Sequence, residues 1–163
     1  MTQQVYISDT NIWIDLRHAG LLDALFDLPL TLCCTDFVLS ELQDFDHTRM
    51  LERGLVVETL DEQATAALFP LMQAHNNSSL ADVSCYQLAK QTGRPLLTGD
   101  GRLRKQALAD GLQVHGALWL LDQMVANQII ERKNAAKGLQ SMMNSGARLP
   151  EADCQKRLAI WTA

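Results

Sequence analysis

The stretch that decides the fold lies near the start of the chain, where a short apolar run ends on an acidic residue. Residues 5–16 read VYISDTNIWIDL. The β-branched and aromatic residues predict a strand over 4–8. Asp9, Thr10 and Asn11 then form a turn or a helix cap, and helical structure follows from Ile12. We therefore expect Asp9 at the carboxyl end of a strand, where open α/β sheets bind their ligands.

Segments of the same two kinds alternate along the rest of the chain. Further strands are expected over 30–34, 55–59, 95–98 and 112–115, and helices over 36–43, 61–75, 80–92, 102–109, 118–125, 134–144 and 151–161. Pro70 should kink or split the helix over 61–75. Apolar strands joined by helical crossovers predict an α/β fold with a central parallel sheet of about five strands and helices on both faces.

The composition indicates a globular protein. Hydrophobic residues make up 47% and charged residues 20% of the 163 positions, which suits one domain with a core. The sequence shows neither a signal peptide nor a stretch that could span a membrane, so we expect a soluble cytoplasmic protein without membrane contact. The cysteines form no Cys-x-x-Cys pair, which argues against a structural zinc site and predicts buried thiols in a reducing compartment.

Charge is divided unevenly along the chain. The net charge of −5 by itself argues against binding to nucleic acid. Residues 1–100 carry 14 acidic and 5 basic side chains, whereas residues 101–163 carry 5 acidic and 9 basic ones. An acidic cluster beside a basic face would suit a cation-dependent enzyme acting on a polyanion, although ordinary sorting of surface charge produces the same pattern.

Three further acids fall where they can join Asp9. Asp100 follows the strand predicted over 95–98, Glu41 lies on the helix after the second strand, and Asp82 lies in the first turn of the helix before the fourth strand. Each has a structural alternative. Asp9 and Asp100 can be plain helix N-caps, Asp82 can belong to a capping box with Ser79, and Glu41 can be a solvated surface residue. The joint placement of the four favours one acidic cleft.

Clustered carboxylates repel one another and would partly protonate without a cation. Oxygen-rich sites suit Mg²⁺ or Mn²⁺, and such ions activate water and orient a phosphodiester. The sequence contains no GxxxxGK[ST] or GxGxxG phosphate loop and no His/Cys nucleophile pair that would compete for this role. The four acids therefore predict a divalent metal site, where a bound ion can orient a phosphodiester and activate water.

Short motifs around these acids resemble the PIN-domain family. Besides residues 5–16, they are TDFVLSEL at 35–42, SLADV at 79–83, LLTGDGRLR at 96–104 and VHGALWLL at 114–121. The resemblance covers about residues 4–126, and residues from about 127 to 163 would form a helical extension of the same single domain. It implies a three-layer α/β/α fold and a ribonuclease that depends on Mg²⁺ or Mn²⁺. Many bacterial members of this size are toxins of type II toxin–antitoxin pairs and form homodimers, so a cognate antitoxin is a possible partner.

The resemblance also assigns roles to individual residues. It makes the four acids catalytic metal ligands, places two polar residues in the lining of the site and makes three basic residues candidate contacts to RNA phosphates. These are, in the same order, Asp9, Glu41, Asp82 and Asp100; Asn11 and Thr98; and Arg102, Arg104 and Lys105. An ordinary cap at Asn11, an ordinary strand position at Thr98 and a solvated basic helix face remain the alternatives.

Other functions fit the residues less well. A haloacid-dehalogenase-type phosphatase requires a second Asp two residues after its nucleophile, and the sequence has Asn11 there. A phosphoacceptor receiver domain requires an acidic pair at the first strand. A catalytically inactive PIN-fold module that binds RNA or a protein is the principal alternative, and the presence of all four acids argues against it.

Overall fold

A computed structural model describes residues 3–75 and 78–163 of the chain. The described residues form a five-stranded sheet, and all four pairs of neighbouring strands run parallel. The strands are β1 (Val5–Ser8), β2 (Thr31–Thr35), β3 (Val56–Glu58), β4 (Leu96–Leu97) and β5 (Val114–His115), in the spatial order β3-β2-β1-β4-β5. The α/β class predicted from the sequence is confirmed.

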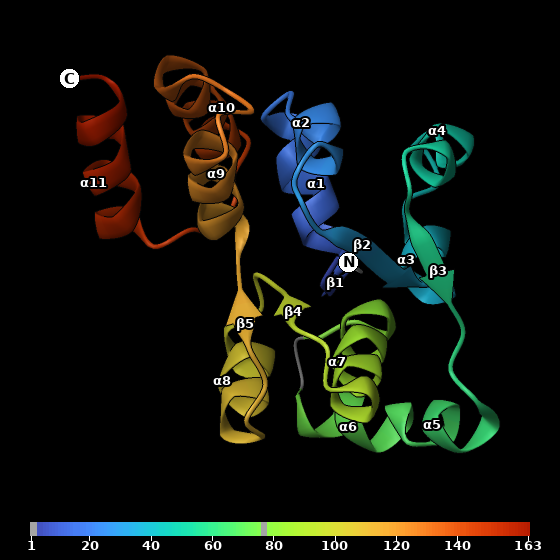
Figure 1. The fold of residues 1–163 in the computed structure, drawn as a ribbon. Coiled ribbons are helices and arrows are strands. Elements are labelled where there is room, and N and C mark those ends of the chain that lie inside the picture. The colour runs from blue at the N-terminus through green and yellow to red at the C-terminus, as the bar shows by residue number, and fades with distance from the viewer. Residues whose placement is uncertain (1–2, 76–77) are drawn as a thin grey trace.

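Helices cover both faces of the sheet and complete three layers (Figure 1). One face carries α5, α6, α7 and α8, and the other carries α1, α2, α9 and α10. The helices are α1 (Thr10–His18), α2 (Leu22–Phe26), α3 (Asp36–Glu41), α4 (His47–Glu52), α5 (Glu62–Ala66), α6 (Leu68–Ala74), α7 (Leu80–Thr92), α8 (Gly101–Ala109), α9 (Ala117–Ala126), α10 (Arg132–Asn144) and α11 (Glu151–Trp161). Within the two described ranges, none of them has the length and apolar character needed to cross a membrane.

The order of the strands reverses between β1 and β4. From β1 the chain moves outward to β2 and β3, and it then returns to the other side of β1 to form β4 and β5. The backbone joins the two strands firmly, because Ile7 N donates to Pro95 O at 2.9 Å and Asp9 N donates to Leu97 O at 3.0 Å. Parallel sheets bind ligands outside such a reversal, at the carboxyl ends of the strands. Asp9 and the segment 98–100 lie at these ends.

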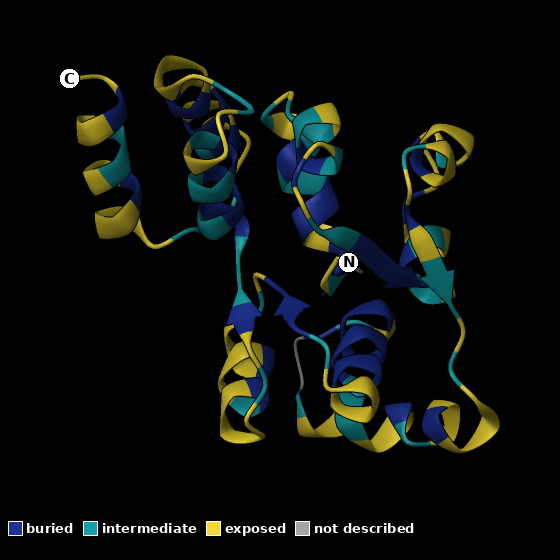
Figure 2. Cartoon of the chain, viewed as in Figure 1, coloured by how far each residue is buried: buried dark blue, intermediate teal, exposed yellow. Residues whose placement is uncertain are grey.

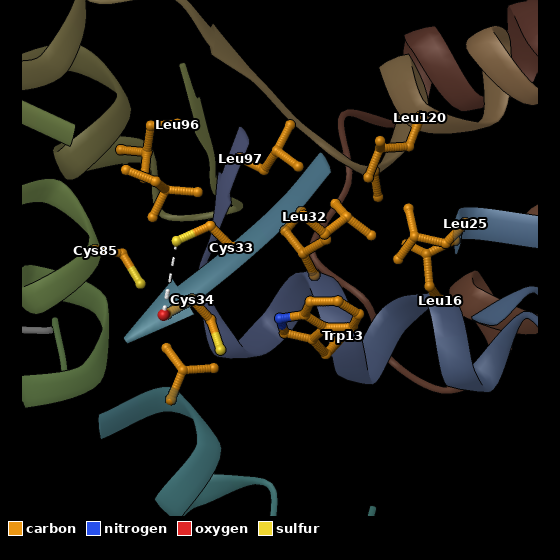
Figure 3. Packing of buried hydrophobic residues seen from close by; sticks show 14 of the residues in the cluster. Trp13, Leu16, Leu25, Leu32, Cys33, Cys34, Cys85, Leu96, Leu97 and Leu120 are labelled. Atoms are coloured by element: carbon orange, nitrogen blue, oxygen red, sulfur yellow. Dashed lines mark hydrogen bonds between the residues drawn. The ribbon is translucent and has the colours of Figure 1, made fainter. Parts of the chain in front are cut away.

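The strands are buried on both faces, which explains why their sequences read as continuous apolar runs. One face of the sheet packs against α7 and carries Ile7, Cys33 and Leu96. Cys85 of α7 lies on this side. Figure 3 shows on the other face Leu32 and Leu97 packed with Trp13, Leu16, Leu25 and Leu120, which come from α1, α2 and α9. Helix α7 is dark blue over most of its length in Figure 2, because it is buried between the sheet and its neighbours. All four cysteines are buried and free, as the sequence predicts.

Two details of the secondary structure differ from the sequence predictions. Helix α4 was not expected; Asp46 begins it by accepting a hydrogen bond from Arg49 N at 3.1 Å. The helix predicted over 61–75 is split, but at Ala67 rather than at Pro70. Pro70 lies in the first turn of α6, where a missing N–H leaves no helical hydrogen bond unmade.

Helices α10 and α11 pack against the helices on one face of the sheet and against each other. Helix α10 contacts α1 and α9, and its buried side chains include Ala135, Leu139 and Met142. Gly138 permits the close approach, because a β-carbon there would lie 2.8 Å from Leu21 Cδ1 and 3.3 Å from Ala19 Cβ. Arg157 Nη2 of α11 forms an ion pair with Asp122 of α9 at 2.7 Å. The extension is therefore fixed relative to α1.

Candidate functional site

Asp9 caps helix α1 and also links β1 to the segment that follows the neighbouring strand β4. The residue is 1% exposed. Its Oδ1 accepts from Ile12 N at 3.1 Å, which begins α1. Its Oδ2 accepts from Thr98 Oγ1 at 2.6 Å and from Gly99 N at 3.4 Å. The capping interpretation is correct for one oxygen, and the other oxygen is held across the reversal between β1 and β4.

Asp100 has the same double use. Its Oδ1 caps α8 by accepting from Arg102 N at 2.9 Å and from Leu103 N at 3.1 Å. Its Oδ2 accepts from Ser78 Oγ at 2.6 Å. Thr98 connects it to Asp9, because the Thr98 hydroxyl also accepts from Asp100 N at 3.0 Å. One threonine hydroxyl therefore bonds both the carboxylate of Asp9 and the backbone N–H of Asp100.

Asp82 lies in the first turn of α7, which Ser79 caps by accepting from Asp82 N at 3.1 Å. The Asp82 side chain is buried, and its Oδ1 has no hydrogen-bond partner. Within the described residues, it is the one carboxylate oxygen that is buried in this unpaired state. Such an oxygen costs free energy unless a cation or a donor reaches it.

Glu41 is the last residue of α3 and is exposed, so in part it fits the alternative of a surface glutamate. Its side chain is nevertheless held toward the start of α1. Its Oε1 accepts from Thr10 Oγ1 at 2.7 Å, and Thr10 directly follows Asp9.

The negative charges of these acids influence one another. Burial, and then the negative charge of Asp82, raises the pKa of Asp9 to about 7, against the opposing hydrogen bonds from Thr98, Ile12 and Gly99. Burial also raises the pKa of Asp82 to about 6, and the charges of Asp100 and Glu41 add to the rise. Asp82 therefore lies within electrostatic reach of the other three acids. The amino-terminal ends of α1, α7 and α8 meet here, and their dipoles offset part of the repulsion.

A cleft of about 820 Å³ opens beside Asp82 and Asp100, whereas Asp9 and Glu41 are not among the residues of the described structure that line it. Four of the residues predicted for the site line it, namely Asn11, Asp82, Asp100 and Arg102. Sequence reasoning missed Asp15 and His18 of α1, which share a helix face with Asn11 at a spacing of four and seven residues. It also missed the α10–α11 loop, residues 145–148, because only tertiary packing brings that loop to the cleft. Burial raises the pKa of Asp15 to about 6, and the charge of His18 opposes the rise.

Comparison with known proteins supports one family. A family model described as a PIN domain matches residues 5–162. The chain belongs to the PIN-domain family. A PilT N-terminus domain protein from the hyperthermophilic archaeon Sulfolobus solfataricus P2 is similar in structure, with a TM-score of 0.51 and 14% sequence identity over 74% of this chain and 92% of that one. That likeness shows the fold alone. No curated protein matches the chain significantly.

PIN domains are commonly nucleases and generally use divalent metals. In the part of this PIN domain that the structure describes, no three Asp, Glu, His or Cys side chains converge closely enough to hold an ion as they stand. Asp9, Asp100 and Glu41 each accept a hydrogen bond from a hydroxyl of the protein itself. The donor set still fits a hard divalent ion, because the acids are all oxygen ligands and Asp82 Oδ1 is buried without a partner.

The basic residues predicted for this PIN domain separate into two groups. Arg102 lines the cleft, whereas Arg104 Nη1 lies 4.0 Å from the position that a β-carbon on Gly116 would take. Burial of His115, and then the positive charge of Arg104, lowers the pKa of His115. Arg104 and Lys105 are not among the described residues that line the cleft. Their role as phosphate contacts therefore remains a prediction.

Thr98 provides a direct test of how the carboxylates are positioned. The change Thr98→Val keeps the shape of the side chain and removes the hydroxyl that donates to Asp9 and accepts from Asp100 N. We expect a loss of about 1–3 kcal/mol in the free energy of unfolding, because buried partners lose their hydrogen bonds. The pKa of Asp9 should rise further, so metal binding should shift to higher pH. Chemical denaturation and Mn²⁺ titration at several pH values measure both effects. Thr98→Ser is the control, and equal behaviour of Val and Ser variants would contradict the positioning role.

Proposed function

We propose that this PIN domain is a Mg²⁺- or Mn²⁺-dependent endoribonuclease whose metal ligands are Asp9, Glu41, Asp82 and Asp100. The observation that carries the proposal is the buried, unpaired Oδ1 of Asp82. It lies among acids whose charges raise its pKa. A divalent cation would satisfy that oxygen and relieve the repulsion at the same time.

The residues of the chain divide the work of such a site. When bound, the ion would polarise a phosphodiester and lower the pKa of the attacking water. Thr98 Oγ1, Ile12 N and Gly99 N donate to Asp9 and favour its carboxylate form, which is the form that binds a cation. Thr10, which directly follows Asp9, donates to the Glu41 carboxylate and holds it toward the start of α1. Asn11 and Arg102 line the cleft that would receive the RNA strand.

Cleavage and metal binding test the proposal together. Single-stranded RNA labelled at its 5′ end should be cut in Mg²⁺ or Mn²⁺ and remain intact in EDTA. Calorimetry should show Mn²⁺ binding to the wild-type chain, and Asp100→Asn should weaken it while keeping the cap of α8, since asparagine also caps helices. RNA binding without metal-dependent cleavage would support the inactive module instead. Absence of Mn²⁺ binding to the wild type would overturn the metal site.

The biological role proposed here is that of the toxin in a type II toxin–antitoxin pair. The support is the PIN family membership and the size of the chain, which suits that group of bacterial nucleases. A homodimer and a cognate antitoxin belong to the same proposal. Induced expression should stop bacterial growth, and a protein encoded beside it should restore growth. Unaffected growth with active, soluble nuclease would contradict the toxin role.

A further inference from the structure

The arginines of the chain divide into paired and unpaired side chains. Five form ion pairs with carboxylates, namely Arg17 with Asp44, Arg49 with Asp23, Arg53 with Asp27, Arg94 with Glu58 and Arg157 with Asp122. The other four, Arg102, Arg104, Arg132 and Arg148, form no ion pair within residues 3–75 and 78–163. Two of these four, Arg102 and Arg148, line the acidic cleft.

Their position is unexpected for unpaired cations, because the same cleft is lined by Asp15, Asp82 and Asp100. A guanidinium group has five donors in a planar fork that matches a carboxylate or a phosphate. Arg102 and Arg148 are exposed and keep these donors free of carboxylates in the described structure. The cleft therefore presents two positive charges from segments far apart in the sequence, beside acids that suit a metal ion.

The backbone that carries Arg148 is fixed. After the end of α10, Gly146 N donates to Met143 O at 3.1 Å and Ala147 N donates to Met142 O at 3.0 Å. Gly146 has a φ of +88°, which favours glycine and lets the chain turn sharply. Because Gly138 lets α10 pack closely on Ala19 and Leu21, this loop is held at the cleft by the same helix layer that carries Asn11.

We propose that Arg148, together with Arg102, binds phosphates of a single-stranded RNA that lies in the cleft, so that the C-terminal extension supplies part of the substrate site. This inference rests on the proposed nuclease function. The acids and their metal ion would hold the phosphate that is cut. Arg148 holds another phosphate of the same strand, and by fixing it sets which phosphodiester reaches the acids. Bidentate hydrogen bonds from arginine to phosphate are strong and directional, as this task requires.

Binding to the RNA can be measured apart from cleavage. The wild-type chain is mixed with a fluorescent single-stranded RNA in Ca²⁺, which oxygen ligands also bind, and gels confirm that the RNA stays intact. Fluorescence anisotropy at several salt concentrations gives the affinity and its salt dependence. Arg148→Gln should weaken binding about tenfold, since hydrogen bonds to charged groups are worth that much. It should also reduce the slope of log K against log salt by about 0.7, the value for one phosphate contact on a single strand.

Two further variants serve as comparisons for Arg148→Gln. Arg132→Gln removes an exposed, unpaired arginine near the start of α10 that does not line the acidic cleft, and it should leave both quantities unchanged. Arg148→Lys keeps the charge and loses the bidentate contact, so the slope should persist while the affinity falls. In Mn²⁺, Arg148→Gln should raise KM more than it lowers kcat, as expected for loss of uniform binding.

The possible outcomes separate this inference from the proposed function. If the wild type binds and cuts RNA but Arg148→Gln binds it with unchanged affinity and slope, the inference is overturned and the nuclease function stands. Equal losses in the Arg148 and Arg132 variants also overturn it, because they would report only the total charge. If the wild type binds RNA and only Arg148→Gln weakens that binding, but the RNA is not cut in any metal ion, the RNA contact stands and the nuclease function fails.

Discussion

Replacing Asp9 by asparagine should lower the rate of RNA cleavage in Mn²⁺ at least about 100-fold, which corresponds to about 2.7 kcal/mol of lost transition-state stabilisation. Asparagine retains an oxygen that can accept from Ile12 N and begin α1. It loses the negative charge that a divalent cation requires. The fold should therefore survive while the activity is lost, as circular dichroism and a gel-based cleavage assay would show together.

Asp46→Asn is the matched control for this change. Asp46 begins α4 just as Asp9 begins α1, with its Oδ1 accepting from the N–H three residues later, at 3.1 Å in both cases. Asp46 is exposed and does not line the cleft, within the described part of the chain. Its variant should cut RNA as fast as the wild type. A slow Asp46→Asn variant, or a fast Asp9→Asn variant, would contradict the assignment of Asp9 to the site.

Asp82→Asn should have opposite effects on stability and on activity. In EDTA at pH 8 the variant should be more stable than the wild type by about 1–2 kcal/mol, because it removes a buried charge next to three other acids. That gain corresponds to a rise of about 2–4 °C in Tm for each kcal/mol in a chain of this size. Cleavage of RNA should be lost. Thermal unfolding with and without Mn²⁺ measures the effect. In Mn²⁺ the wild type should be more stable than Asp82→Asn, because only the wild type gains stability from tight binding of the ion.

The same carboxylates make the stability of the wild type depend on pH. The folded chain has pKa values of about 7 for Asp9 and about 6 for Asp82, against 3.8 for an ordinary aspartate. Between pH 4 and 7 the folded state therefore binds more protons than the unfolded state, and stability in EDTA falls as the pH rises through this window. Asp82→Asn should flatten that dependence, and Asp61→Asn, which changes an exposed cap of α5, should not. If Asp82→Asn is no more stable than the wild type at pH 8, the charge of Asp82 does not destabilise the fold.

Much of the fold was predictable, because local chemistry and tertiary structure agree. Thr35 and Ser79 each directly precede a predicted helix, and each accepts the hydrogen bond of a cap. Gly93 directly follows the helix predicted over 80–92 and ends α7 with a φ of 72°, the left-handed geometry that glycine adopts readily. The apolar strand sequences predicted a sheet buried on both faces, and the structure confirms it. The placement of Asp9 and Asp100 at strand ends followed from the same reasoning.

The parts that sequence reasoning missed depend on contacts between distant residues. Nothing in the local sequence around Arg148 indicates a cleft, because its place there depends on the packing of α10 against α1. The unpaired oxygen of Asp82 is likewise a property of the assembled site. Asp15 and His18 had a usable signal in their helical spacing from Asn11, which identifies the residues on the same face once that face is known.

The pairing of β1 with β4 sets when this chain can act during its own synthesis. Strand β1 leaves the ribosome well before β4, because the hydrogen bond from Thr98 to Asp9 joins residues 89 positions apart. Ser78, Asp82 and Asp100 also come late relative to Asp9, and residues 145–148 come later still. A nascent chain therefore carries Asp9 without the partners that hold its second oxygen until Thr98 and Gly99 have also been made. Long-range pairing of this kind also slows folding. Under the proposed nuclease function, the chain would thus leave the ribosome inert and acquire its site only after residues 98–100 and 145–148 have been made.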